Sequence, residues 1–339
     1  MHPPDLLVVG SANADLVIGV ERRPGAGETV LGSDLAVRPG GKGANQAAAA
    51  ARLGARTSLL ARVGDDAHGR LLLDALGDAG ADTRTVRRGG APTGVALITV
   101  DPTGDNSIVV SPGANARLTP EDVAASEDVL GAARVVSLQL EIPLETVESA
   151  VRSAVRAGTR VVLNPSPVAP LAADVLAACD PLVLNEHEAR VLLADSGPEA
   201  EADSGLPDSD LPGSRLADSG LPDSGLADSA TSPEEWAAAL LRRGPRSVVI
   251  TLGPEGALAA ERADGDGTHA VRVPSPSVPA VDTTGAGDAF TGALAWRLAR
   301  ADSLADAVRY AVRVGAAAVT RAGAQESYPS AGEVDALLG

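Results

Sequence analysis

The first apolar segment of the chain reads Leu6-Leu7-Val8-Val9-Gly10-Ser11-Ala12-Asn13-Ala14-Asp15 and runs directly into a polar turn. Four consecutive apolar residues are typical of a strand that is buried on both faces, as in a parallel sheet. A doubly wound sheet binds its ligands outside the carboxyl ends of its strands, which is where Asn13 and Asp15 fall. These two side chains are therefore candidate ligand groups; alternatively, they stabilise the turn by bonding to its backbone.

Further apolar runs of the same kind follow at regular intervals along the chain. They occupy residues 59–63, 135–138, 161–163, 182–184 and 248–252. Segments with helical spacing lie between them, at residues 44–53, 144–157, 233–243 and 289–299. This alternation predicts an α/β fold with three layers: a doubly wound, mostly parallel sheet with helices on both faces.

Two regions, residues 15–37 and 93–110, depart from this alternation. Leu16, Ile18 and Val20 alternate along the first region and Val95, Leu97 and Thr99 along the second, and turn residues such as Gly104-Asp105 separate the runs. Such patterns are typical of antiparallel strands. We expect a small separate β-sheet, a lid over the carboxyl edge of the main sheet, formed by residues 13–37 and 93–111; alternatively, these are edge strands of the main sheet. Residues 5–12, 38–92 and 112–339 then form the α/β domain.

Composition excludes several classes of function. The 339 residues are 45% hydrophobic with a formal net charge of −17. This charge argues against binding to nucleic acid or to an anionic membrane surface. A single cysteine rules out an intrachain disulfide or Cys-ligated zinc, and the four histidines are scattered. The N-terminus lacks the pattern of a signal peptide and no run is long enough to cross a membrane, so we expect a cytoplasmic protein.

Residues 196–232 contain a repeated pentad, Asp-Ser-Gly-Leu-Pro and close variants. A period of five matches neither a helix nor a strand, and the stretch is polar and rich in Pro and Gly. It carries eight acidic residues and one arginine. We expect a disordered acidic insert that has no part in the function.

The sequence from Pro39 to Gln46 reads Pro-Gly-Gly-Lys-Gly-Ala-Asn-Gln and precedes a helix. It is not a P-loop, because Gly43 stands where Ser or Thr must follow the lysine, and it lacks the third glycine of a dinucleotide fingerprint. It offers bare backbone, the cation of Lys42 and the amide of Asn45 at a helix start. This combination suits a polyhydroxylated ligand, although a glycine-rich turn of this kind is often only a turn.

The strongest segment runs from Asp282 to Phe290 and reads Asp-Thr-Thr-Gly-Ala-Gly-Asp-Ala-Phe. Its Gly-Ala-Gly turn leads into a helix whose free N–H groups favour a negatively charged ligand. Asp288 at the helix start is either a simple N-terminal acid or a base beside this anion hole. In the second interpretation it takes the proton from an attacking hydroxyl group.

Two further polar segments follow predicted strands. One runs from Asn185 to Glu188, and the other from Thr251 to Gly256. Glu188 is a candidate for holding Mg²⁺ through water, the usual manner for that ion, or it is a helix N-terminal acid. Gly253 and Gly256 let the backbone approach a nucleotide, or they only make a turn.

Taken together, these segments resemble the ribokinase branch of the PfkB-type sugar kinase family, over residues 10–327 apart from the insert. The segments that carry the resemblance are 11–15, 40–46, Gln139-Leu140-Glu141, Asn185-x-x-Glu188, 282–288 and 320–325. Each is modest alone, but the six in this order are specific.

The resemblance implies ATP-dependent phosphorylation of D-ribose at O5, which gives D-ribose 5-phosphate. It implies that Asp288 is the base and that Gly285, Ala286 and Gly287 form the anion hole. The residues facing the sugar would be Asn13, Asp15, Gly41, Lys42, Gly43, Asn45 and Glu141, together with Asp288. ATP would contact Asn185, Thr251, Leu252, Gly253, Pro254, Glu255, Gly256, Gly287 and Val312. Val312 stands where relatives often carry a polar residue, so adenine recognition there rests on packing.

The resemblance also implies Mg²⁺, a monovalent cation that is usually K⁺, and a homodimer through the lid. The positions that match the monovalent cation site are Asp282, Thr284, Ala318, Arg321, Gly323 and Ser327. A kinase for 2-deoxyribose or another furanose remains an alternative, as does a sugar or nucleotide sensor without catalytic activity.

Overall fold

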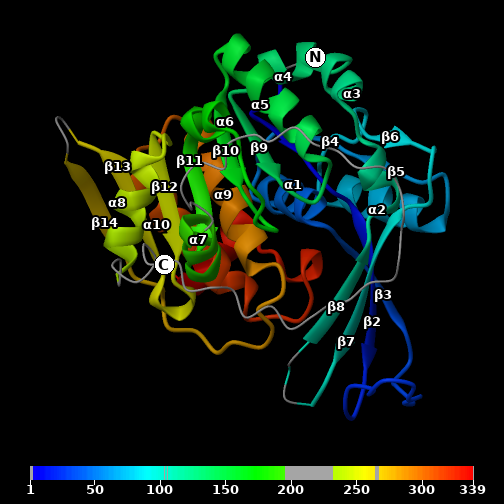
Figure 1. Ribbon diagram of the computed structural model, residues 1–339. Coiled ribbons are helices and arrows are strands. Elements are labelled where there is room, and N and C mark those ends of the chain that lie inside the picture. Colours follow the sequence, from blue (N-terminus) through cyan, green and yellow to red (C-terminus); the bar gives the residue numbers. More distant parts are fainter. Residues whose placement is uncertain (1–2, 103, 105, 195–231, 264–266, 339) are drawn as a thin grey trace, which may run out of the picture.

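The computed structural model describes residues 3–102, 104, 106–194, 232–263 and 267–338. The acidic insert predicted at 196–232 therefore lies outside the described residues, apart from Ser232. The main domain is a sheet between two layers of helices, and a second, smaller sheet projects from it (Figure 1). The three-layer α/β architecture and the separate small sheet are as predicted. No helix in the described part of the chain combines the length and the apolar character that a membrane span needs.

The main sheet is parallel over most of its width. From one edge to the other its strands are β4 (Thr57–Leu60), β1 (Leu6–Val9), β9 (Val135–Gln139), β10 (Arg160–Asn164), β11 (Cys179–Asn185), β12 (Ser247–Thr251), β13 (Ala257–Arg262) and β14 (Thr268–Val273). The order reverses beside β1, so that β1 is flanked by β4 and β9. A topological switch point of this kind leaves room for a ligand at the carboxyl ends of the strands.

Two details of this sheet differ from the prediction. The apolar run at 59–63 is not one strand: β4 ends at Leu60, and β5 (Arg62–Val63) pairs with β6 (Arg87–Arg88) instead. The antiparallel pair β13 and β14 at the sheet edge was not predicted. Strand β13 begins Ala-Leu-Ala-Ala, which has low intrinsic strand propensity, and pairing with β12 overrides that local preference.

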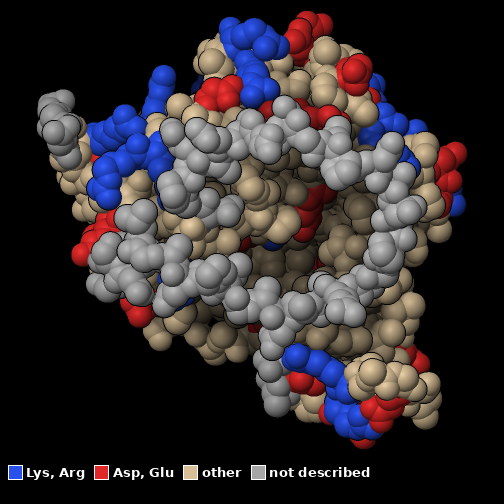
Figure 2. All heavy atoms as spheres, in the orientation of Figure 1, with Lys and Arg blue, Asp and Glu red and all other residues tan. Residues whose placement is uncertain are grey.

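The small sheet consists of β3 (Ala36–Gly40), β2 (Asn13–Gly19), β7 (Gly94–Val100) and β8 (Asn106–Ser111), in that order. The two outer pairs are antiparallel as expected, but β2 and β7 at the centre are parallel, which corrects the all-antiparallel prediction. Because β2 and β7 both leave the main domain in the same direction, they can only pair side by side in parallel. Figure 2 shows the face hollowed between this lid and the main domain, with acidic side chains inside the hollow.

One face of the main sheet is covered by α1 (Lys42–Arg52), α2 (Ala67–Asp78), α9 (Ala286–Ala299), α10 (Leu304–Ala318) and α11 (Ala331–Leu338). The other face is covered by α3 (Pro120–Ala124), α4 (Glu127–Ala132), α5 (Leu144–Ala157), α6 (Ala173–Ala178), α7 (Glu186–Ala194) and α8 (Pro233–Arg242). A separate aliphatic cluster fills each side of the sheet. The predicted helices agree with α1, α5, α8 and α9 to within three residues.

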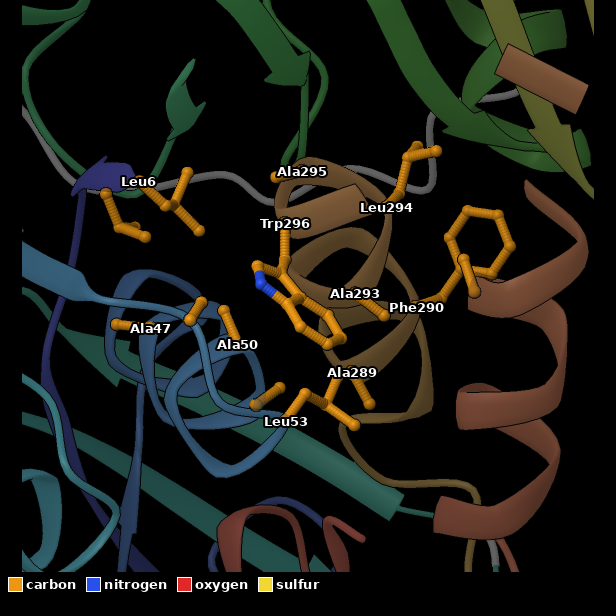
Figure 3. Packing of buried hydrophobic residues seen from close by; sticks show 14 of the residues in the cluster. Leu6, Ala47, Ala50, Leu53, Ala289, Phe290, Ala293, Leu294, Ala295 and Trp296 are labelled. Carbon is orange, nitrogen blue, oxygen red and sulfur yellow. The ribbon is translucent and has the colours of Figure 1, made fainter. Parts of the chain in front are cut away.

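Helix α9 is the most buried helix next to the site. It lies between α1 and α10, with Phe290 on the side of α10 (Figure 3) and the ring of Trp296 edge-on to that of Tyr310 in α10, at a centroid distance of 5.7 Å. Gly292 permits the close approach to α1, since a Cβ there would lie 2.5 Å from the carbonyl oxygen of Gln46. This packing fixes the start of α9 beside the first turn of α1.

Candidate functional site

The site centres on Asp288, in the first turn of α9 and only 8% exposed. Each of its carboxylate oxygens accepts a hydrogen bond from a side-chain amide of α1. Asn45 Nδ2 donates to Oδ2 at 3.0 Å, and Gln46 Nε2 donates to Oδ1 at 3.2 Å. The structure thus brings together Asn45 and Asp288, both predicted from sequence, and adds Gln46.

Burial raises the pKa of Asp288 above its usual range, although Lys42 and the two amide donors act in the opposite direction. Desolvation disfavours the charged carboxylate, which makes it a stronger base once ionised. Lys42 itself is half-buried among carboxylates. Burial alone would lower the pKa of Lys42, but Asp288, Glu141 and Glu188 raise it, so the ammonium stays charged.

The predicted anion hole begins at Gly285, which caps α9 in the left-handed conformation with φ +73°. Its carbonyl accepts a hydrogen bond from the hydroxyl of the buried Tyr328 at 3.1 Å. The N–H of Ala286 donates to the carbonyl of Thr283 at 3.2 Å, whereas Gly287 is exposed. The turn therefore presents the N-terminus of α9 next to Asp288, where anions are favoured.

The glycine motif packs against the turn that follows β1. Lys42 N donates to Glu141 Oε2 at 3.1 Å, and Ser11 Oγ donates to the same oxygen at 2.5 Å. Gly41 has φ +87°, and a Cβ on it would lie 2.7 Å from the backbone nitrogen of Asn13. The glycines are thus needed for close packing of two backbone segments, which brings Asn13, Lys42 and Glu141 to one place.

Sequence reasoning missed Asn115, whose side chain is buried, with the residue 1% exposed. It lies in the 3₁₀ turn Gly113–Arg117, which follows β8. Its Oδ1 accepts from the backbone N–H of Ala12 at 2.9 Å, and its Nδ2 donates to Asn13 Oδ1 at 2.7 Å. Gly94 leaves room for this contact, since a Cβ there would lie 2.3 Å from Asn13 Oδ1. Asn115 thereby fixes the orientation of Asn13; nothing in its local sequence marks it for this role.

Asp15 lies on β2 in an acidic environment. Burial, followed by the charges of Glu141, Glu326 and Asp288, raises the pKa of Asp15 to about 7. A Cβ on Gly40 would lie 2.1 Å from Asp15 Oδ2, so the neighbouring strand must carry glycine there. Asp15 also belongs to the wall of a cavity of about 530 Å³, which the lid strands form with residues 280–284 and 322–324.

We expect Asp15→Asn to stabilise the protein at pH 8 more than at pH 5. The folded state holds the Asp15 proton up to about pH 7, whereas an unfolded chain releases it near pH 4. The folded state therefore binds more protons between these values, and the free energy of unfolding falls as the pH rises through that window. The Asp15→Asn variant has no proton to release at this position, so its free energy of unfolding does not fall for this reason. Thermal melts at both pH values check this prediction, with Asp34→Asn, at an exposed position, as the control. If the melting temperatures of Asp15→Asn and the unmodified protein differ by the same amount at pH 5 and pH 8, the assignment is wrong.

The residues predicted to bind a monovalent cation come from two adjoining segments. Asp282 accepts the backbone N–H of Thr284 at 2.9 Å and that of Gly323 at 2.8 Å, and these bonds lower its pKa although burial opposes them. Ala318 and Ser327 are buried, with Ser327 Oγ donating to the Ala324 carbonyl at 2.8 Å. Arg321 turns to Glu333 at 2.8 Å, which leaves only its carbonyl for an ion.

The residues predicted for the nucleotide lie at the carboxyl ends of β11 and β12. Asn185 and Glu188 bond to each other's backbone N–H, at 2.9 Å and 2.8 Å, which is a capping arrangement at the start of α7. Beyond Thr251 and the buried Leu252, residues Gly253, Pro254 and Glu255 form an exposed 3₁₀ turn.

The two glycines of this turn differ in their surroundings. A Cβ on Gly253 would meet nothing within 4 Å, so its backbone is open to a ligand. A Cβ on Gly256 would lie 2.0 Å from the Val273 carbonyl, so this glycine serves packing. Val312 is only 5% exposed and belongs to the aliphatic cluster of α9 and α10.

Comparison with known proteins places the chain in a family. Residues 3–331 match the pfkB family of carbohydrate kinases. The chain is 37% identical to a ribokinase of Schizosaccharomyces pombe (98% of this chain, 96% of that protein) and 34% identical to a deoxyribokinase of Salmonella typhi (96% of each). It superimposes on Arabidopsis thaliana ribokinase complexed with ribose and ATP, with a TM-score of 0.80 at 31% identity over 100% of this chain and 99% of that one.

The chain therefore belongs to the pfkB family of carbohydrate kinases. Within it, the chain is an enzyme of the ribokinase branch.

Proposed function

We propose that this enzyme transfers the γ-phosphoryl group of ATP to O5 of D-ribose, with Asp288 as the general base. The observation that carries the proposal is the buried Asp288 carboxylate, held by two amides at the N-terminus of α9. A base in this place lies beside the position where a phosphoryl group gains charge. The ribokinases among the relatives, one of them solved with ribose and ATP, support the same choice of substrates.

In this mechanism Asp288 removes the proton from the O5 hydroxyl as O5 attacks the γ-phosphorus. The bond between the γ-phosphorus and the bridging oxygen breaks, and ADP leaves with the electron pair. The first N–H groups of α9, including Gly287, stabilise the charge of the transferring group. Asn13, Asp15 and Glu141 orient the sugar hydroxyls, and a positioned base supplies a factor of about 10²–10⁴ in rate.

Two kinds of cation are part of the proposal. Glu188 is the acid that would hold Mg²⁺ through water, and Mg²⁺ would neutralise charge on the phosphates of ATP. The 282–284 and 318–327 segments carry carboxylate, hydroxyl and carbonyl oxygens of the kind that a hard monovalent cation prefers, and the bond from Gly323 N–H to Asp282 joins the two segments. Such an ion would lie next to the Gly285 turn. Its positive charge would add to that of the α9 N-terminus and so favour the binding of a negatively charged substrate group there. The use of ATP is in keeping with a cytoplasmic enzyme.

The deciding experiment measures ADP release over a panel of pentoses, with and without K⁺. We expect D-ribose to be the best substrate, with kcat/KM for 2-deoxyribose lower on the order of 10–100-fold, because a hydrogen bond from a substrate hydroxyl to a charged group is lost. A preference for 2-deoxyribose would favour the deoxyribokinase alternative that the Salmonella relative represents. If sugars bind but no ADP is released, the alternative of a sensor without catalytic activity would be favoured.

We also propose a homodimer through the outer face of the lid. Val37, Leu97 and Val109 lie in one row across the small sheet and are 40%, 50% and 65% exposed. The opposite face, with Val17, lines the cavity. An exposed apolar sheet face of this kind is typical of an interface.

We therefore expect the double variant Leu97→Glu/Val109→Glu to be a monomer, because two acids at the centre of such an interface are buried without partners. Sedimentation velocity at several protein concentrations measures this. Val155→Glu is the matched control, since Val155 is 56% exposed on α5, away from the lid. If the unmodified protein already sediments as a monomer at tens of micromolar, the proposal is wrong.

A further inference from the structure

The Asp288 carboxylate ends two short chains of amide side chains. On one side, Gln46 Nε2 donates to Asp288 Oδ1 at 3.2 Å, and Gln46 Oε1 accepts from Gln139 Nε2 at 2.5 Å. On the other side, Asn45 Nδ2 donates to Oδ2 at 3.0 Å, and Asn45 Oδ1 accepts from Gln325 Nε2 at 3.0 Å. Two amide chains of the same polarity therefore converge on one carboxylate.

The carboxylate imposes this polarity. An ionised carboxylate only accepts hydrogen bonds, so the adjacent amide must turn its N–H inward and its oxygen away. The outward oxygen of Gln46 then requires donors, which Ser137 Oγ supplies at 2.9 Å together with Gln139. At the outer ends, Gln139 Oε1 and Gln325 Oε1 are buried and have no hydrogen-bond partner among the described residues. Both outer glutamines thus give up an acceptor bond to direct their donors inward.

We propose that Gln46 is the positioning residue of Asp288, and that Ser137 and Gln139 act through Gln46 by fixing its amide. Gln46 is 0% exposed, so it cannot touch a substrate and can act only through Asp288. Asn45, at 6% exposure, differs because it is also a proposed sugar ligand. The inference rests on the proposed role of Asp288 as the base.

Positioning by Gln46 has a measurable consequence for the proton of Asp288. The Gln46 N–H favours the ionised carboxylate and opposes burial, which disfavours it. The other titratable groups that face Asp288 are Lys42, Glu141, Asp15 and Tyr328. Replacing Gln46 leaves these four groups unchanged. Loss of the Gln46 N–H donor therefore makes Asp288 harder to ionise.

The test is the pH profile of kcat at saturating D-ribose and ATP, for Gln46→Met and Gln139→Leu. Loss of a hydrogen bond to a charged group predicts that the acid limb of Gln46→Met moves up by about one to two pH units. Gln139→Leu shifts it in the same direction by less, because Ser137 still holds the Gln46 amide. Repeating the series in an Asp15→Asn background removes the carboxyl group of Asp15, whose pKa of about 7 would add a second titration to the profile.

Combining the two substitutions shows whether Gln139 acts through Gln46 or whether the two glutamines act on Asp288 independently. If Gln139 acts only through Gln46, then Gln46→Met/Gln139→Leu shifts the limb no further than Gln46→Met alone. Thr159→Val is the control, since it also loses a buried hydrogen bond, to the Leu130 carbonyl at 3.3 Å, at the amino end of β10 and so at the opposite edge of the sheet from the site; its activity and limb stay unchanged. If Gln46→Met unfolds, Gln139→Leu carries the test alone.

One outcome would overturn the inference about Gln46, and a different outcome would overturn the proposed role of Asp288 on which it rests. An acid limb that stays in place in Gln46→Met and Gln139→Leu, while kcat or the melting temperature falls, gives both glutamines a merely structural role. Near-normal turnover of Asp288→Asn would instead remove the base itself.

Discussion

Asp288→Asn is expected to lower kcat on the order of 10³-fold while D-ribose still binds. The asparagine is nearly isosteric but cannot take up the O5 proton, and loss of a positioned general base removes about 10²–10⁴ in rate. The sugar contacts proposed for Asn13, Asp15 and Glu141 come from other elements, which the substitution does not change. A coupled ADP-release assay measures kcat, and titration calorimetry measures ribose binding.

The control for this substitution is Asp306→Asn, which removes an exposed acid from the first turn of α10. It keeps normal turnover if the effect at Asp288 is specific. The asparagine at 288 also turns an NH₂ group toward Asn45 or Gln46, so a thermal melt must accompany the kinetics. Turnover within a few-fold of the unmodified enzyme would show that another group takes the proton, and loss of ribose binding together with kcat would indicate a disrupted site.

Gly43→Ala is expected to lower kcat/KM on the order of 10²-fold, although its side chain gains only a methyl group. A Cβ at Gly43 would lie 2.7 Å from the backbone of Gly10 and Ser11. The neighbouring bond from Ala44 N to the Ser11 carbonyl, 2.8 Å long, holds the two segments together. Helix α1 must therefore move outward and carry Asn45 away from Asp288, and a misplacement of about 1 Å can cost 10²-fold in rate.

Overpacking of this kind also lowers the free energy of unfolding, by about 1–3 kcal/mol. Gly77→Ala on α2 is the matched control, because a Cβ there meets nothing within 4 Å. Gly77 lies in the last turn of α2, where alanine gains at most the roughly 0.5–1 kcal/mol by which it exceeds glycine in a helix interior, so this variant keeps its activity and melts no lower. If Gly43→Ala remains fully active, the docking of α1 on the turn after β1 is not what aligns the site.

Much of the fold followed from local pattern. Continuous apolar runs mark β1 and β9 to β12, since strands buried on both faces need no polar alternation. Strand β13 was missed because its Ala-rich sequence resembles a helix, and only pairing with β12 makes it a strand. The parallel pairing of β2 with β7 was missed for a related reason: alternation predicts a strand but not the direction of its neighbour.

The candidate site divides in the same way. Asp288 and Asn45 were found because they stand in recognisable glycine-rich segments, and Asp15 because it follows the first buried strand. Asn115 was not, since its role depends on contacts to Ala12 and Asn13, more than 100 residues away. Local sequence carries no signal for such a partner.

The sequence by itself determined the layered α/β architecture and the residue types that gather at the carboxyl ends of the strands, because periodicity and turn chemistry are local properties. Only the tertiary structure decided which amide meets which carboxylate oxygen. Gln46 and Asp288 are 242 positions apart in the chain. Their contact exists because α1 and α9 pack side by side on one face of the sheet, and that packing depends on the shapes of both helices together.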